Sequence, residues 1–317
     1  MTDTSIKIDL HTPTIRASVD EQRVRAEAKS APPRLPWHPL RNLPDLHGFW
    51  TLRTQWGEDG DSLDEVARYD MRREGVELPM YGSTGRSAEG SGPVLRVSDS
   101  GSIDRYADVS PQVDDEDGEY FFRCGHANDV GDAESDRLKR SFTPLIESGG
   151  SVLVTARPDF EAMDGEISTT SVAGQHYSFE FTGWYWLNQE SNDWRVEFRI
   201  REATGDGSDA ENILVVHSDP DFLTPDDHEK WITVGFAVDD TECAFFKNGE
   251  VHSVHEHGGR FIDPDTADPI QYPFCFGAHR AGRLPWNGDV SDVAVCFEPI
   301  TEGTAWHWHQ WATEEDT

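Results

Sequence analysis

Two tryptophans and a row of charged side chains in one short segment are the residues of this sequence best suited to binding chemistry. They are Trp184, Trp186, Arg195, Glu197 and Arg199. Aromatic rings stack on the faces of sugar rings, and guanidinium groups bind carboxylates or sulfates through paired hydrogen bonds. The sequence therefore predicts a glycan-binding platform. The alternative is structural: the arginines neutralise acidic neighbours, and the tryptophans are covered by another part of the chain or by another subunit.

A β-hairpin over residues 178–202 is the element that must position these side chains. In its first half, Phe179, Phe181 and Tyr185 alternate with polar residues and with the two tryptophans. In its second half, apolar residues alternate with the charged row in the same way. Side chains of a strand point alternately to its two faces, so the pattern predicts two strands with an apolar inner face and the platform on the outer face.

Two further groups of residues are candidate metal ligands. Asp263, Asp265 and Asp268 share a proline-containing loop and supply the oxygen ligands that Ca²⁺ prefers. The three histidines within residues 252–257 are weaker candidates for zinc, because only two of them share a face of a strand and a further ligand is needed. The sequence indicates no required cofactor and leaves Ca²⁺ as the candidate ion.

The stretch from Trp231 to Glu298 carries the clearest strand pattern. Residues 232–238 alternate between large apolar and small or polar side chains, which predicts a half-buried strand. Asn248-Gly249 between two apolar runs predicts a type I′ hairpin turn, because this turn needs positive φ at both central residues. Successive short strands separated by turn residues predict an all-β sandwich.

The order of these parts resembles the C-terminal half of a laminin-G-like, or concanavalin A-like, jelly roll. A Trp-led strand precedes a strand ending in Lys-Asn-Gly-Glu, a strand ending in Phe-Gly, and a closing Gly-Asp-Val-Ser-Asp-Val-Ala-Val strand. The match covers residues 231–298 and is looser upstream. The resemblance implies an all-β fold, a two-sheet antiparallel jelly-roll sandwich, with a lectin-like role in carbohydrate binding and, in some members, calcium at the rim.

The domain boundaries follow from this resemblance and from composition. We expect an N-terminal arm or linker over residues 1–45, in which four prolines between residues 32 and 39 favour extended conformation. The laminin-G-like domain is expected over residues 46–302, with an acidic insertion at 111–140, and residues 303–317 form a short C-terminal tail. We interpret the arm as a segment that docks on other subunits of a homo-oligomer or larger assembly. The alternative is a disordered tail.

Catalytic motifs on the same fold match this sequence poorly. The Arg-Val-Glu-Phe-Arg run at 195–199 resembles a strand of jelly-roll alginate lyases, but the tyrosine that such lyases use as an acid or base is missing after Phe246-Lys-Asn-Gly249. The Glu-x-Asp-x-x-Glu strand of laminarinase-type hydrolases is absent from the sequence. We therefore expect a non-catalytic protein. A polysaccharide lyase or a glycoside hydrolase is the alternative.

Net charge is the most unusual bulk property of the chain. Its 317 residues include 60 Asp and Glu against 27 Lys and Arg, which gives a net charge of −33. Most of the basic residues are arginine, and the acidic residues are spread along the whole chain. This composition is typical of halophilic proteins, because at molar salt the Debye length falls to about 3 Å and self-repulsion is screened. The same charge argues against a nucleic-acid partner, since the surface repels phosphate.

Export and membrane signals bear on where the protein works. No apolar run approaches the roughly 20 residues of a membrane span, so we expect no membrane insertion, and the N-terminus lacks the regions of an export signal. Together with the lectin-like resemblance, this leads to the hypothesis of a halophilic virion surface component, a decoration, turret or tail-attachment protein. It would contact a host glycan or glycoprotein surface, or other virion subunits. A cytoplasmic binding module is the alternative.

The cysteines do not identify a site. Cys124, Cys243, Cys275 and Cys296 are sparse for this length and form no Cys-x-x-Cys pair. Three of them lie in predicted strands, where cysteine behaves as a small buried apolar side chain. A disulfide such as Cys275–Cys296 is an alternative that the sequence does not decide.

Overall fold

The structure is a computed structural model that describes part of the chain. The described residues are 5–8, 15–18, 37–53, 58–59, 65–66, 80–82, 93–98, 103–109, 122–124, 142, 145, 148–159, 169–175, 179–188, 191–202, 211–257, 274–277, 286 and 288–313. Within them, no helix is long and apolar enough to cross a membrane. The expected calcium-binding loop lies outside these residues, and so does most of the expected acidic insertion.

The chain divides into two compact units, Met1–Trp37 and His38–Thr317. In the first unit, β1 (Ser5–Ile8) pairs antiparallel with β2 (Ile15–Ser18), a hairpin that the sequence pattern did not predict. The expected boundary at residue 46 falls inside the second unit. Short helix α2 (Pro39–Asn42) is followed there by the fully buried Leu43, so residues before 46 already contribute to the core of this unit.

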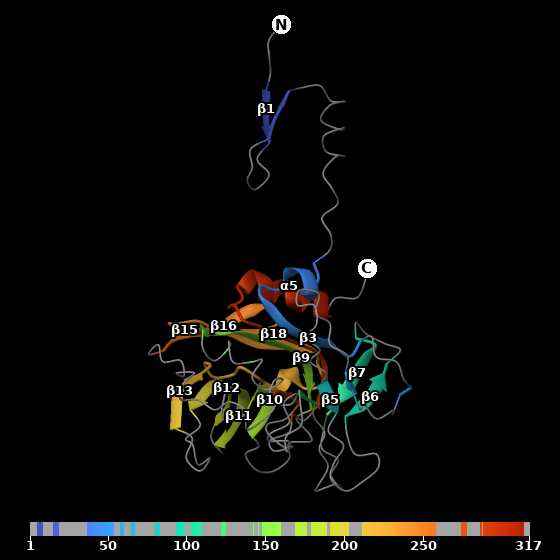
Figure 1. Ribbon diagram of the computed structural model, residues 1–317, viewed down its shortest axis with the longest axis vertical. Coiled ribbons are helices and arrows are strands. Elements are labelled where there is room, and N and C mark those ends of the chain that lie inside the picture. Colours follow the sequence, from blue (N-terminus) through green and yellow to red (C-terminus); the bar gives the residue numbers. More distant parts are fainter. Residues whose placement is uncertain are drawn as a thin grey trace. The chain divides into compact units, whose positions relative to one another are not determined.

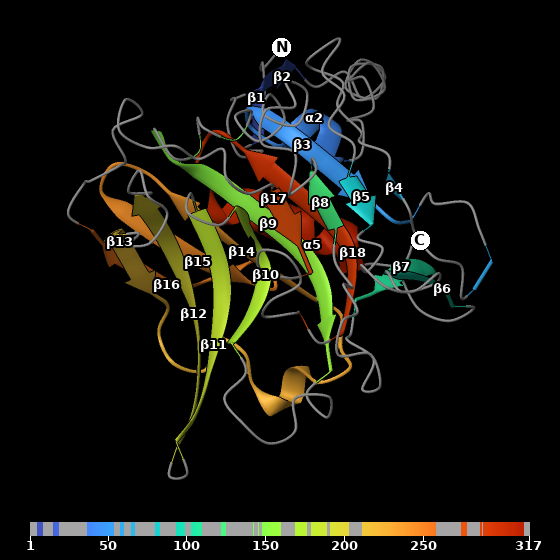
Figure 2. The same cartoon turned by 60° about the horizontal axis from the view of Figure 1, so that its bottom comes forward.

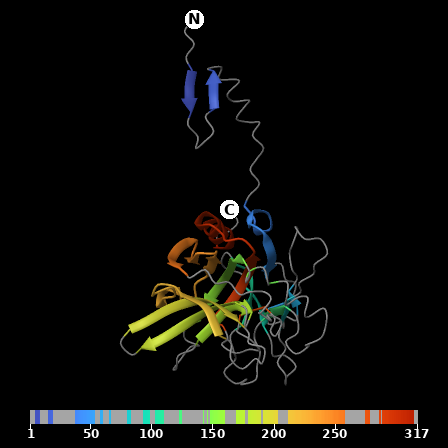
Figure 3. The same ribbon diagram turned by 60° about the vertical axis from the view of Figure 1, so that its left-hand side comes forward.

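The second unit is a two-sheet antiparallel β-sandwich, which confirms the predicted fold class. Sheet I has the order β13-β12-β11-β10-β17-β8-β5-β4, and sheet II the order β16-β15-β14-β9-β18-β7-β6, with β3 beside β7 along the same edge of β18. Figures 1 and 3 show the two sheets as separate layers. All described strand pairs are antiparallel.

The strands of sheet I are β4 (Glu65–Val66), β5 (Met80–Gly82), β8 (Phe122–Cys124), β10 (Thr169–Gln175), β11 (Phe179–Asn188), β12 (Ser191–Glu202), β13 (Glu211–His217) and β17 (Phe274–Phe276). Those of sheet II are β3 (Leu46–Thr51), β6 (Val94–Val97), β7 (Arg105–Asp108), β9 (Gly150–Pro158), β14 (Ile232–Val238), β15 (Glu242–Lys247), β16 (Glu250–Glu256) and β18 (Gly288–Cys296). Strand β8 lies within the expected insertion, so part of that segment belongs to the sandwich.

The hydrophobic core lies between the inner faces of the two sheets. Sheet I contributes Ala173, Val196, Phe274 and Phe276, and sheet II contributes Val154, Val234, Phe236, Val293 and Val295. Trp50 of β3 stacks on Phe274 at 5.8 Å between ring centroids, and Phe142 stacks on both rings. Alternation along each strand places these side chains inward, as the period-2 pattern predicts.

Strand β14 is buried on both faces, whereas the sequence predicts a half-buried strand. All seven of its residues are buried. The outer face is covered by helix α5 (Glu302–Thr313), which buries Trp308 and Ala312 and contacts Thr233 through its His309 side chain at 3.1 Å. Figure 1 shows this helix lying over sheet II. The expected C-terminal tail is therefore a third layer over part of the sandwich.

The predicted hairpin turn is formed, and three cysteines are buried in the two sheets. Asn248 and Gly249 have φ values of 51° and 82°, as a type I′ turn between β15 and β16 requires. Cys243, Cys275 and Cys296 are buried and are not in disulfides, so the Cys275–Cys296 disulfide is not formed. Cys275 belongs to sheet I and Cys296 to sheet II, and both side chains are buried.

Candidate functional site

A row of charged residues crosses the outer face of sheet II. Arg157 at the end of β9 lies opposite Asp289 of β18, and Asp289 lies opposite Asp108 of β7. Directly opposed residues of neighbouring strands point to the same face. The residues next to this row point the other way into the core, namely Ala107, Ala156 and Val290.

A β-bulge in β18 places two aspartates on this outer face. The register between β18 and β9 shifts between Val290 and Asp292, so the strand holds one extra residue there. In a regular strand only residues an even number of positions apart share a face. The extra residue brings Asp289 and Asp292, which are an odd number of positions apart, to the same face of the sheet. Asp292 is fully buried beside α5 and bonds to Arg53 at 2.9 Å, whereas Asp289 lies beyond the helix and lines an open pocket.

Arg157 is the central side chain of this pocket. Its guanidinium donates to Asp289 Oδ2 at 2.7 Å and to Tyr106 Oη at 3.0 Å. The same guanidinium lies 4.7 Å from the ring centroid of Tyr106 and 5.3 Å from that of Trp231, and these two rings meet edge to face. Cation–π contact and the ion pair together fix the position of a partly exposed cation.

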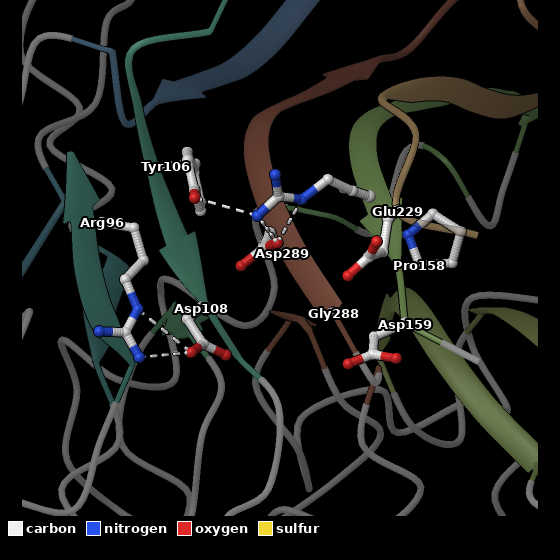
Figure 4. A pocket seen from close by; sticks show the side chains of 9 residues that line it. Arg96, Tyr106, Asp108, Pro158, Asp159, Glu229, Gly288 and Asp289 are labelled. Carbon is white, nitrogen blue, oxygen red and sulfur yellow. Dashed lines mark hydrogen bonds and ion pairs between the residues drawn. The ribbon is translucent and has the colours of Figure 1, made fainter. Parts of the chain in front are cut away.

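The pocket has a volume of about 350 Å³ and a mostly polar wall. It is lined by Arg96, Tyr106, Asp108, Arg157, Pro158, Asp159, Glu229, Gly288 and Asp289. In Figure 4, Arg96 and Asp108 lie on one side, Asp159 and Glu229 lie on the other beside Pro158, and Asp289 lies between them. Arg96 pairs with Asp108 at 2.8 Å. Hydrogen-bond donors and acceptors therefore face each other across a space of ligand size.

The wall formed by Asp159 and Glu229 depends on an unusual backbone conformation. Glu229 has a φ of 54°, a left-handed conformation that non-glycine residues seldom adopt. Its backbone N–H donates to the carbonyl of Pro158 at 2.9 Å, which holds the loop before β14 against the end of β9. Asp159 follows Pro158 directly and lies 3.8 Å from His228 Nδ1. Two carboxylates from distant segments are thus brought to one side of the pocket.

Burial and ion pairing shift the pKa values of the pocket residues. Burial raises the pKa of Asp289 from 3.8 to about 6, although Arg157 acts in the opposite direction. Burial on its own lowers the pKa of Arg157, but Asp289 and Tyr106 outweigh it and raise the pKa above its ordinary value. The hydrogen bond to Asp108 raises the pKa of Arg96. At neutral pH, Asp289 is therefore ionised and paired, and it becomes neutral below about pH 6.

The predicted platform lies on the other sheet. Strands β11 and β12 pair as predicted, with Trp184 opposite Arg195, and Trp186 opposite Asp193. The hairpin is a long ribbon at one side of the sandwich in Figure 2. Val196 is buried in the core and the neighbouring Arg195 is half-buried, so Arg195 lies on the outer face of sheet I. Glycan binding by Trp184, Trp186, Arg195, Glu197 and Arg199 stays a prediction.

The predicted metal sites are not formed by described residues. Asp263, Asp265 and Asp268 lie outside the described part of the chain, so calcium binding there stays a prediction. Among the residues that the structure describes, no group of three or more His, Cys, Asp or Glu side chains is arranged to hold a metal ion. His252 contacts the carbonyl of Asp219, and His257 contacts the carbonyl of Asp239, so these two histidines contribute to loop packing.

The sequence pattern does not predict the pocket, although two signals point to it. Asp289 and Asp292 interrupt an otherwise apolar strand, and a charge in a buried strand needs a partner of opposite sign. Arg157 ends a strand whose other side chains are apolar or small, and Trp231 begins the next strand of the same sheet. No spacing rule joins these residues, because they meet only through the order of strands in sheet II.

Comparison with known proteins gives similarity of fold alone. No protein-family model matches the chain, and no curated protein matches it. Domain 4 of AbnA, a GH43 extracellular arabinanase from Geobacillus stearothermophilus, in complex with arabinotriose, has a TM-score of 0.49 at 11% identity, covering 86% of this chain and 100% of that one.

Two further structures are similar to this chain. The Ruminococcus gnavus IT-sialidase CBM40 bound to α2,3-sialyllactose has a TM-score of 0.35 at 13% identity, covering 59% of this chain and 92% of that one. The botulinum neurotoxin serotype D binding domain has a TM-score of 0.46 at 9% identity, covering 84% and 51%. Because these values are low, no residue of these proteins is matched to one of this chain, and the chemistry of the pocket follows from its own side chains.

Proposed function

We propose that this protein is a non-catalytic carbohydrate-binding β-sandwich and that the Arg157 pocket on the outer face of sheet II is its sugar site. The observation that carries the proposal is the polar pocket itself, in which two guanidinium groups, four carboxyl groups and a tyrosine hydroxyl surround about 350 Å³. Sugar hydroxyls both donate and accept hydrogen bonds. A wall with paired donors and acceptors therefore suits a hydroxylated ring better than an apolar ligand.

Preorganisation of Arg157 supports the same proposal. Its guanidinium is held by Asp289, Tyr106 and Trp231, so a ligand meets a donor whose rotamer is already fixed. Less side-chain entropy is then lost on binding. Tyr106 lines the pocket and is half-buried, which leaves part of an aromatic surface beside the polar groups. Aromatic and polar surfaces side by side match the two kinds of surface that a sugar ring presents.

A glycoside hydrolase is the second candidate, and one observation favours it. Asp289 has a pKa raised to about 6 in a pocket that also contains Asp159 and Glu229. Retaining and inverting hydrolases use a carboxylic acid of raised pKa together with a second carboxylate. Against this, Asp289 Oδ2 is occupied by Arg157 at 2.7 Å. Incubation with polysaccharides and assay of reducing ends separates the two, since a binding protein releases none.

We also propose where the protein binds carbohydrate. The net charge of −33 supports work at high salt. We propose a surface component of a virion or another particle outside the cell, which contacts a glycan or glycoprotein surface and other copies of itself through residues 1–45. A calcium ion held by Asp263, Asp265 and Asp268 belongs to the same proposal. Recovery of the protein from purified particles of its source would support this setting; its recovery only from the cytoplasm would contradict it.

The sugar site is tested by substitution at Arg96. Its side chain is partly exposed and pairs with Asp108 at the pocket, so Arg96→Gln removes a charged donor without opening the core. We expect binding of neutral oligosaccharides to weaken about tenfold, the cost of a hydrogen bond from a charged group. Arg41→Gln, at an exposed position of α2, is the matched control and should leave binding unchanged. Equal affinity of the Arg96→Gln variant and the unsubstituted protein in calorimetry would contradict the proposal.

A further inference from the structure

Exposed apolar side chains of the second unit lie together at one edge of sheet II. Among the described residues, the exposed large hydrophobic side chains are Val251 and Val254 of β16 and Trp306 of α5. Trp306 lies over the turn that leads into β16, because a Cβ atom placed on Gly249 would come within 2.7 Å of its Cα atom. The three side chains therefore form one surface, which we call the β16 patch, and are not scattered single residues.

A β-bulge places both valines of the patch on the outer face of sheet II. The register between β15 and β16 shifts, so β16 holds one extra residue between the partners of Phe245 and Phe246. Val251 is opposite Phe246, and Val254 is opposite Ala244. Phe246 and Ala244 alternate with Phe245 of the core, so they lie on the outer face of the sheet. Both valines therefore face outward, although three positions separate them.

The outer edge of β16 is available for a further strand. β16 ends sheet II, and β15 is the only described strand with which it pairs. Such an edge presents backbone N–H and C=O groups that can pair with another chain. The N–H of Val251 donates to Glu302 Oε1 at 3.4 Å, a long bond at an exposed position that a backbone carbonyl can replace. A bulge does not prevent pairing in this sheet, because β18 is bulged and pairs with both β9 and β3.

The surroundings of the β16 patch are acidic. Exposed glutamates of β15, β16 and α5 are Glu242, Glu250, Glu256 and Glu302, and no ion pair between described residues includes one of them. Lys247, the one Lys or Arg of these three elements, lies 2.6 Å from Asp227. A partner with an apolar face and positive charge is therefore complementary. Because a stable interface between whole proteins takes about 20–30 residues a side, this small patch suits a short segment.

The N-terminal hairpin of this chain has the complementary pattern. Its cross-strand pairs include Ile6–Ala17, Lys7–Arg16 and Ile8–Ile15. Successive positions of a strand belong to opposite faces, so the ribbon has one apolar face and one basic face. A two-stranded hairpin is marginally stable alone, and like charges at directly opposed positions lower its stability further. The hairpin is therefore an element that gains stability from a partner with apolar and acidic surfaces.

The net charge of the two units differs in sign. Residues 1–37 contain 6 of the 27 Lys and Arg and 5 of the 60 Asp and Glu, a net charge of +1. Residues 38–317 therefore carry a net charge of −34. Two copies of the large unit repel each other, whereas the N-terminal segment is not repelled by the large unit of another copy.

We propose that β16 accepts the β1–β2 hairpin of a second copy of this chain, so that the apolar face of the hairpin continues the β16 patch. This inference rests on the proposed contact between copies through residues 1–45. The basic face then lies on the inner side of the extended sheet, where Glu250 is opposite Lys247 and Lys247 is opposite Val234 of the core. Backbone hydrogen bonds supply affinity, and alternate side chains supply specificity. Reciprocal donation by two copies closes a dimer.

Sedimentation velocity of the full chain and of patch variants tests where the contact lies. In about 0.3 M KCl, where repulsion between chains is partly screened, we expect dimers or larger species. Val254→Asp should weaken association at least about tenfold, because it places a charge in the apolar patch at an exposed position. Trp306→Ala should act in the same direction. Lys230→Gln, at an exposed position before β14, makes the same change in net charge as Val254→Asp and should leave association unchanged.

Charge reversal in the hairpin tests which segment is donated. Lys7→Glu together with Arg16→Glu keeps a like-charged pair at the same register position, so repulsion within the hairpin is retained. We expect this double variant to associate at least about tenfold more weakly. Adding Glu250→Lys should strengthen its association by about threefold or more. Asp104→Lys, at an exposed position near the far edge of sheet II, makes the same change in charge and should restore none.

The contrary outcomes are distinguishable. A full chain that stays monomeric up to about 100 μM would contradict the contact between copies on which the inference rests. Unchanged association of Val254→Asp would leave that contact standing and show that β16 does not accept it. Association weakened by Val254→Asp but unchanged by reversal of Lys7 and Arg16 would show that the patches of two copies meet directly, and would overturn donation of the hairpin. Sugar binding by the Arg157 pocket is measured separately by calorimetry.

Discussion

Arg157 gives the outer face of sheet II its chemistry. A guanidinium stays protonated at all working pH values, so its partners determine how it is presented. Asp289 pairs with it on one side, and the rings of Tyr106 and Trp231 hold it on the other. The ion pair with Arg157, whose guanidinium the two rings hold in place, explains why Asp289 can be buried while ionised. A lysine at position 157 would keep the charge but lose the planar contacts with both rings.

The pKa of the Asp289 carboxyl group can be predicted from its surroundings. Its pKa is raised to about 6 by burial, so its carboxyl carbon should titrate near pH 6 in NMR spectra of the folded protein. The charged groups that face it, Arg157, Arg96 and Asp108, act on it in both directions. A midpoint at or below pH 4 would contradict the prediction and would mean that the attraction of Arg157 outweighs burial.

The same shift predicts how stability depends on pH. The folded-state pKa of Asp289 is above the unfolded value of 3.8, so the folded protein binds more protons between about pH 4 and 6. The contribution to the free energy of unfolding is present in full below pH 4 and is lost as pH rises through 6. It amounts to at most about 3 kcal/mol. Asp289→Asn should remove this slope in urea unfolding at constant salt, whereas Asp240→Asn, at an exposed position, should keep it.

At the scale of elements, helix α5 divides the outer face of sheet II into a covered part and an open part. Under the helix, Thr51 and Arg53 bond to the buried Asp292. Arg53 also contacts Trp311 of the helix at 4.9 Å, so the same guanidinium joins the sheet to α5. Beyond the helix, the equivalent row of charged side chains is open to solvent and forms the pocket. The helix therefore sets one limit of the candidate site.

Substitution of two tryptophans of α5 tests how much the packing of this helix contributes to the free energy of unfolding. Trp308 is fully buried and Trp306 is 47% exposed on the same helix. Trp308→Ala should lower the free energy of unfolding by about 3–5 kcal/mol, the usual cost of removing a large buried ring. Trp306→Ala should change it by less than about 1 kcal/mol. Denaturant unfolding measures both, and equal effects of the two substitutions would contradict the placement of α5.

The sequence predicts elements well where a local pattern is complete. Strand β14 and the Asn248-Gly249 turn follow from alternation and from the need for positive φ, which depend on neighbouring residues alone. Burial of the second face of β14 does not follow, because α5 supplies it from a segment more than 60 residues away in the chain. The β1–β2 hairpin was missed because short strands of mixed polarity give little periodic signal.

The pocket is less predictable than the strands that form it. Its lining comes from β6, β7, β9, the loop before β14, and β18, and these meet only through strand order in the sheet. Local pattern identified Trp184 and Arg195 because they share one hairpin. It could not join Arg157 to Asp289, which are partners through cross-strand register and a bulge. Sequence patterns therefore indicate a site within one hairpin more readily than a site formed by several strands of a sheet.

At the scale of the whole molecule, net charge is the dominant feature. Sixty acidic residues against 27 basic ones create self-repulsion that opposes the compact state at low salt. The two partly buried ion pairs on sheet II, Arg157–Asp289 and Arg53–Asp292, are shielded from bulk ions to a greater degree than the surface charges. Salt should consequently affect overall stability more than it affects the pairs that define the pocket.

The salt dependence of stability tests whether the high net charge destabilises the folded protein at low salt. The Debye length falls from about 10 Å at 0.1 M salt to about 3 Å at 1 M, so repulsion among surface carboxylates is strongly reduced. We expect the free energy of unfolding to increase by at least about 2 kcal/mol between 0.1 M and 2 M KCl. Sucrose at matched osmolarity is the control, because it favours burial without screening charge. Stability that is flat in KCl, or equal in sucrose and KCl, would contradict the proposed adaptation to high salt.

The most direct test of the sugar site is NMR mapping of the full chain with and without a bound oligosaccharide. The site on sheet II predicts that the indole N–H of Trp231 and the side-chain N–H of Arg157 shift on addition of the ligand, because Arg157 lines the pocket and the Trp231 ring lies against its guanidinium. We expect saturation at one ligand per chain, and the Arg96→Gln variant should need about tenfold more ligand to produce the same shifts. Shifts confined to the indoles of Trp184 and Trp186 would place the site on the β11–β12 hairpin instead, and would contradict the central claim.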